Sequence, residues 1–229
     1  MIATQIGKTV GRTILALSLL SSLQGCPLLV AGAAGGGALV ASDRRTLGAQ
    51  TEDREIQVKA VAQLKRELPN EAHISVTAFN RRVLLTGEAP NASAKLKAET
   101  IVRAIGNVQE VVNELAVQGA SSFASRSNDS YLTAKIKASH VNAPDISATF
   151  IKVVTERGIV YLMGLVTNSE GKRAAELAGR VPGVLQVVKV FQYISDAEAK
   201  KLSLGAPPQP GHAPTSEVNK TLPTPSQQK

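Results

Sequence analysis

The sequence predicts an α+β protein that contains two copies of one unit, and three observations lead to this class. The middle of the chain repeats itself without a gap at an offset of 77 residues. Each copy passes between helical and alternating hydrophobic spacing in the order helix, strand, strand, helix, strand. The length of 229 residues leaves room for one or two small domains.

The residues that are identical between the two copies occupy two kinds of position, turns and the hydrophobic core. Identical residues meet at both kinds of position: Ile74 with Ile151, Val83 with Val160, Leu85 with Leu162, Gly87 with Gly164, Asn91 with Asn168, Gly106 with Gly183 and Val111 with Val188. We interpret the four glycines as turn or cap residues. Agreement at both kinds of position is hard to obtain by chance, so we infer a duplicated unit.

The first copy shows clear start and stop signals for its helices. Thr51 or Asp53 can cap a first helix, and Pro69-Asn70 ends it. Asn91 can cap a second helix, which Gly106 stops. The expected elements are a helix from Thr51 or Asp53 to Leu68, strands at 73–79 and 82–88, a helix at 91–105 and a strand at 108–117.

The second copy is expected to repeat this order. Its elements fall at 129–141, 149–156, 158–165, 168–181 and 184–194. Two helices can cover one face of a three-stranded mixed sheet, which makes a two-layer unit. The other face of each sheet stays apolar and bare, and only eleven residues, 118–128, separate the copies. We therefore expect the two units to pack as one compact body.

The N-terminus has the pattern of an export signal. Within residues 1–25, the first part contains Lys8 and Arg12 but no acidic residue. An apolar run follows that is too short to span a bilayer. The run ends in Leu-Gln-Gly before Cys26, the single cysteine, which resembles a bacterial lipobox. That resemblance implies acyl chains on Cys26 and a lasting membrane anchor. The alternative is a buried or free cysteine in a cytosolic protein.

The segments that flank the repeat are expected to lack a core. Residues 26–45 are rich in glycine and alanine and predict a flexible tether, and Pro27, by resemblance to sorting rules, favours the outer membrane. Residues 196–229 are proline-rich and predict a disordered tail. Removing the signal lowers the formal charge from +8 to about +6. A basic exported protein points to anionic envelope surfaces as partners, while nucleic acid lies in the wrong compartment.

Short motifs in both copies resemble the BON domain. They are VLLTG at 83–87 and RAIGNV at 103–108, with VYLMG at 160–164 and RVPG at 180–183. A tandem pair behind a lipobox resembles the dual-BON outer-membrane lipoproteins of the DolP (YraP) family over most of residues 23–195.

The resemblance implies domains at 46–118 and 129–195 with a linker at 119–128, each domain a three-stranded mixed sheet covered by two helices. It also implies a protein on the periplasmic face of the outer membrane that binds anionic phospholipid through its second BON domain. That protein would gather at the division site and support outer-membrane integrity, with assembly or division proteins as further partners.

Catalytic chemistry is not indicated. His73, His140 and His212 are scattered, and neither metal-ligand spacing nor a phosphate loop is present. We therefore expect no enzyme activity, no cofactor and no metal. The competing function is a protein-binding scaffold for an outer-membrane assembly or peptidoglycan-remodelling machine.

The best candidate surface is the first helix of the second copy. Leu132 and Ile136 form its core stripe, and a second stripe lies beside them. The expected phospholipid-binding residues are Tyr131, Ala134, Lys135, Lys137, Ala138 and Val141. An aromatic ring, small apolar residues and lysines suit a membrane interface, and the resemblance places the family's lipid-contact helix here. The alternative is that Tyr131 packs between the two domains. The equivalent helix of the first copy has no aromatic residue and carries acids, so we expect it not to bind lipid.

Overall fold

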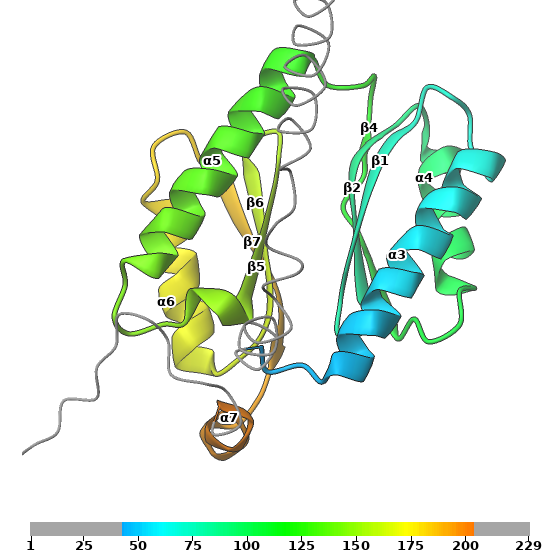
Figure 1. Ribbon diagram of the computed structural model, residues 1–229. Coiled ribbons are helices and arrows are strands. Elements are labelled where there is room, and N and C mark those ends of the chain that lie inside the picture. The colour runs from blue at the N-terminus through cyan, green and yellow to red at the C-terminus, as the bar shows by residue number, and fades with distance from the viewer. Residues whose placement is uncertain (1–42, 204–229) are drawn as a thin grey trace, which may run out of the picture.

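The computed structural model describes residues 43–203 (Figure 1). The predictions for the signal, Cys26, residues 27–42 and residues 204–229 fall outside this range. No helix within 43–203 is both long and apolar enough to cross a membrane.

The first unit has the predicted order of elements, except that the predicted third strand at 108–117 is divided into β3 and β4, so this sheet has four strands instead of three. Its central strand β2 is antiparallel to β1 and parallel to β3 and β4. Helices α3 and α4 pack on one face of this sheet over a core that includes Ile56, Leu64, Val83 and Leu85. The elements are α3 (Leu47–Glu67), β1 (His73–Phe79), β2 (Arg82–Ala89), α4 (Ala92–Arg103), β3 (Glu110–Asn113) and β4 (Ala116–Val117).

The second unit repeats this plan, which confirms the predicted α+β class. Strand β6 lies between antiparallel β5 and parallel β7, and α5 and α6 cover one face. The elements are α5 (Phe123–Val141), the short 3-10 helix η2 (Ala148–Phe150), β5 (Ile151–Glu156), β6 (Ile159–Val166), α6 (Asn168–Gly179), β7 (Gln186–Tyr193) and α7 (Asp196–Ser203). Helix α7 corrects the tail prediction, because residues 196–203 are helical and bury Ala199.

The two sheets face each other in the middle of the molecule, with the helices on the two outer sides (Figure 1). A third apolar cluster fills the space between them and contains Phe79, Leu84, Tyr161, Met163 and Val190. The prediction of one compact body is therefore confirmed. The physical reason is that each sheet has one face that its own helices leave uncovered.

The segment before α3 connects both units. Arg44 pairs with Glu170 at 2.7 Å and lies 4.0 Å from the Phe150 ring centroid. Arg45 pairs with Asp53 at 2.7 Å and lies 4.0 Å from the Phe79 ring centroid. Residues 43–45, assigned to the tether by sequence, instead pack against the folded body.

The predicted caps of the first helix were wrong. Thr46 caps α3, with its hydroxyl accepting from Ala49 N, and Ser122 caps α5, so both helices begin several residues earlier than expected. Asp53 has a different role: its buried carboxylate accepts hydrogen bonds from the backbone N–H groups of Asn80 and Arg81, at 2.7 and 2.8 Å. It holds the left-handed turn between β1 and β2 against the helix.

The alignment of the two copies at an offset of 77 residues is correct in the β1–β2 and β5–β6 hairpins. In the segments that follow these hairpins, the equivalent residues are 76 apart. Val83 is paired with Val111, whereas its equivalent Val160 is paired with Val187 rather than with Val188. The offset changes because Pro90 separates Ala89 from the cap Asn91, whereas the cap Thr167 follows Val166 directly. The same shift makes Asn107, with φ of 68°, the equivalent of Gly183, with φ of 100°, so Gly106 is not the left-handed stop residue.

Candidate functional site

Helix α5 separates a buried face from an outer face. Leu132 and Ile136 are buried on the sheet, whereas Tyr131 is 58% and Val141 67% exposed. All six expected contact residues are exposed: Tyr131, Ala134, Lys135, Lys137, Ala138 and Val141. Because α5 lies on an outer side of the molecule (Figure 1), Tyr131 does not pack between the domains.

Sequence reasoning missed a second aromatic residue on this face. Phe123 is 80% exposed and is the first residue of α5. It precedes Val141 by 18 residues, which is about five turns and brings both side chains to the same side of the helix. The sequence assigned Phe123 to a linker, although its spacing of eight residues to Tyr131 was a usable signal. We call Phe123, Tyr131, Ala134, Ala138 and Val141 the outer stripe.

Positive charge flanks the outer stripe. The Lys135 ammonium lies 4.9 Å from the Tyr131 ring centroid, a cation–π contact that orients both side chains. The acid of α5, Asp129, is 5% exposed and accepts from the N–H groups of Arg157 and Gly158. The helix therefore presents basic side chains at its surface while its single carboxylate faces inward.

A pocket of about 440 Å³ opens beside the C-terminal end of α5, between the two domains. It is lined by Lys137 and Val141 of α5, by Arg45 and Phe79 of the first domain, and by Lys152 of β5. Burial first, and then the Arg45 guanidinium, lowers the pKa of Lys152. Arg45 is engaged by Asp43 and Asp53, so Lys137 and Lys152 are the cations of this lining that can receive an anion.

The two histidines within residues 43–203 have separate environments. His140 is buried, its Nε2 lies 3.0 Å from the Ala174 carbonyl oxygen, and burial lowers its pKa. Its place is the core of the second domain. His73 lies at the domain interface beside two carboxylates that are distant in sequence, Glu88 and Glu156.

Comparison with known proteins gives one family for both domains. The BON domain model matches residues 52–119 and 128–195. The chain is 38% identical over 174 residues to "Outer membrane lipoprotein DolP" of Haemophilus influenzae, which covers 75% of this chain and 90% of that protein. It is 34% identical over 154 residues to "21 kDa hemolysin" of Actinobacillus pleuropneumoniae, covering 66% of this chain and 79% of that protein. A protein of Anaplasma centrale that carries no functional name is 36% identical over 117 residues, covering 50% of this chain and 78% of its own length.

Proposed function

Because the chain belongs to the BON-domain family, as a dual-BON outer-membrane lipoprotein of the DolP family, we propose that it binds anionic phospholipid through α5 and so supports outer-membrane integrity. The binding needs no catalysis. In this proposal acyl chains on Cys26 keep the domains at the membrane, and α5 makes the second contact with lipid.

The observation that carries the proposal is the outer stripe together with its charges. Aromatic and aliphatic side chains lie along one exposed face of a 19-residue helix, and basic side chains flank them. A helix of this kind lies in the plane of a membrane interface, with its apolar side chains among the acyl chains and its lysines at the phosphates. Phe123 at the start of α5 and Val141 at its end extend this contact over the whole helix.

The pocket beside α5 suits a phosphate from the same lipid. Lys137 belongs both to the flank of the helix and to the pocket, and Lys152 is the more buried of these two lysines. An anion would stabilise the charged form of Lys152, which burial disfavours. The apolar part of the lining, Phe79, Val141 and Ile151, fits the glycerol and upper acyl region.

Vesicle flotation of residues 42–229 tests the proposal, since this fragment keeps every described residue. We expect binding to phosphatidylglycerol vesicles, none to phosphatidylcholine vesicles, and weaker binding as salt rises. Tyr131→Glu should remove most binding and leave the circular dichroism spectrum unchanged. The matched control is Val58→Glu on α3, which adds the same charge at a side chain that is 65% exposed.

A scaffold that docks other proteins would give different results. Its fragment would ignore headgroup charge, and Tyr131→Glu would bind vesicles like the parent protein. Either result would overturn the phospholipid proposal. Gathering at the division site is tested by a fluorescent fusion in dividing cells, in which Tyr131→Glu should spread the signal around the envelope.

The anchor has its own test. Mass spectrometry of the membrane-extracted protein should find Cys26 as the acylated N-terminal residue. A chain that retains Met1, or has an unmodified Cys26 thiol, would contradict the predicted lipid anchor. It would leave the proposal that α5 binds phospholipid unaffected.

A further inference from the structure

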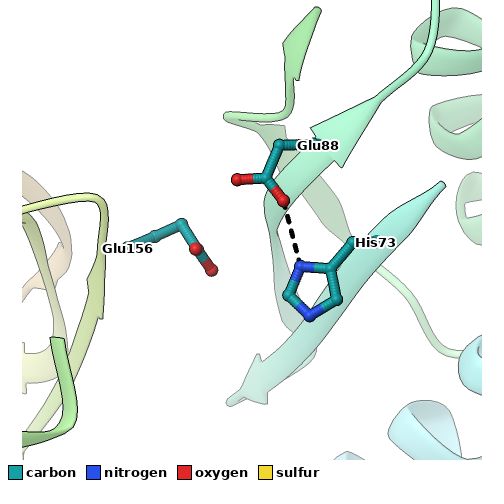
Figure 2. A group of neighbouring side chains, drawn as sticks. All are labelled: His73, Glu88 and Glu156. Atoms are coloured by element: carbon teal, nitrogen blue, oxygen red, sulfur yellow. Dashed lines mark hydrogen bonds and ion pairs between the residues drawn. The ribbon is translucent and has the colours of Figure 1, made fainter. Parts of the chain in front are cut away.

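Three metal-ligating side chains meet at one end of the domain interface. His73 of β1, Glu88 of β2 and Glu156 of β5 each offer one ligand atom, and these atoms lie within 4.8 Å of one another (Figure 2). The spacings of 15 and 68 residues along the chain resemble no metal motif, so no sequence pattern predicted this cluster. Only the packing of one domain on the other creates it.

The two side chains of the cluster that come from the first domain, His73 and Glu88, are held by the sheet itself. His73 and Glu88 are directly opposite each other in the β1–β2 pairing, with Nδ1 3.0 Å from Oε2. Gly87, with φ of 106°, lets the strands approach, since a Cβ there would lie 2.1 Å from the His73 carbonyl oxygen. Glu156 reaches toward this pair from the other domain (Figure 2).

The cluster holds buried negative charge that the described residues only partly neutralise. Glu88 is 0% and Glu156 7% exposed, and Oε1 of Glu88 has no hydrogen-bond donor within residues 43–203. The Nε of Arg157 lies 3.8 Å from that oxygen, beyond hydrogen-bond distance, and this Nε has no hydrogen-bond partner within the described range. A buried carboxylate oxygen without a donor is costly unless a cation binds it.

The opposite end of the interface shows the contrast. The residues equivalent to His73, Glu88 and Glu156 are Phe150, Leu165 and Phe79, which form no polar cluster. There the guanidinium groups of Arg44 and Arg45 lie over the two phenylalanine rings. The His-Glu-Glu cluster is therefore not a by-product of the duplication.

We propose that His73, Glu88 and Glu156 bind one divalent transition-metal ion across the domain interface, with Zn²⁺ as the best fit. One imidazole nitrogen and two carboxylate oxygens suit Zn²⁺, which takes such ligands at about 2.0–2.2 Å in tetrahedral geometry. A small inward movement of the long Glu156 side chain closes the ligand set, and a water or the free Glu88 oxygen completes it. The ion would join the two domains in the same way as a crosslink.

Metal binding by the full mature chain, purified in detergent and stripped with EDTA, tests the proposal. Equilibrium dialysis against Zn²⁺ should give one ion per chain, and Zn²⁺ should raise the thermal midpoint. His73→Gln should weaken Zn²⁺ binding by more than about tenfold, since even changes to groups that only support a ligand cost that much. The matched control, His212→Gln, should bind like the parent.

A second variant separates metal binding from a structural role. Glu156→Gln removes one buried charge and keeps the shape, so the metal-free protein should unfold at the same temperature as the parent or higher, while its response to Zn²⁺ is lost. Because the His73 side chain is 37% exposed, His73→Gln should also fold. Absence of stoichiometric Zn²⁺ binding, or binding unchanged in both variants, would overturn the proposal and leave an ion-pair network with Arg157.

Discussion

Helices α3 and α5 occupy equivalent places on their sheets at an offset of 76 residues, yet they present different outer faces. Their buried positions correspond: Asp53 with Asp129, Ile56 with Leu132, Ala60 with Ile136 and Leu64 with His140. On the outer face, α3 has Leu47, Glu55 and Lys65 at the positions where α5 has Phe123, Tyr131 and Val141, respectively. The two copies share the pattern of their cores, because packing constrains it, while packing places no such constraint on the exposed faces.

The charges of the two helices strengthen this contrast. Helix α3 carries four acids and four bases, whereas α5 carries three bases and the buried Asp129. Because the two helices lie on opposite outer sides of the molecule (Figure 1), one flat membrane cannot contact both. We therefore expect only the α5 side to face lipid.

The largest effect is expected in the buried stripe of α5. Ile136→Ala should lower the free energy of unfolding by about 2–5 kcal/mol, because it leaves a cavity in the core of the second domain. Tyr131→Ala, on the outer stripe of the same helix, should change it by less than about 0.5 kcal/mol. Denaturant unfolding measures both, and similar losses would mean that the two faces are wrongly assigned.

The two buried aspartates should behave alike despite the different outer faces. Asp53→Ala and Asp129→Ala each leave two turn N–H groups without an acceptor, so each should cost about 2–4 kcal/mol in denaturant unfolding, and Asp53→Ala also removes the ion pair with Arg45. A cost in only one domain would show that the equivalent turns do not need the same support.

The outer faces should differ in vesicle binding. Phe123→Ala should weaken binding to phosphatidylglycerol vesicles about tenfold, since inserting a phenylalanine side chain contributes up to about 1.5–3 kcal/mol. Leu47→Ala, the equivalent change on α3, should leave binding unchanged. Equal effects of both changes would contradict the asymmetry between the helices.

The smallest effect concerns pH. Burial lowers the pKa of His140 in the folded protein, so below about pH 6.5 the unfolded chain takes up a proton that the folded chain resists. This contribution to stability is complete above that pH and is lost as the pH falls toward the folded pKa. His140→Leu, which introduces the residue found at the equivalent position of α3, Leu64, should make the free energy of unfolding depend less on pH in this range. An unchanged pH dependence in this variant would mean that a group other than His140 causes it.

The predictable part of the site was local. The period of Leu132 and Ile136 assigned the outer stripe because a helix on a sheet hides one face, and that needs no knowledge of the partner. Phe123 was missed because Ser122, the true cap, lies in a serine-rich stretch that also suits a linker. Asp53 was misread as a cap because the N–H groups that donate to its carboxylate, those of Asn80 and Arg81, lie 27 and 28 residues later in the chain.

The sequence by itself determined the duplicated α+β unit, the order of its elements and the exposed stripe of α5, since hydrophobic period and turn residues act over a few neighbours. The tertiary structure alone decided how the two sheets are aligned on each other, that α3 and α5 lie on opposite sides, and that His73, Glu88 and Glu156 come together. Such contacts join residues far apart in the chain. They depend on how two bare sheet faces pack, and no local pattern encodes that packing.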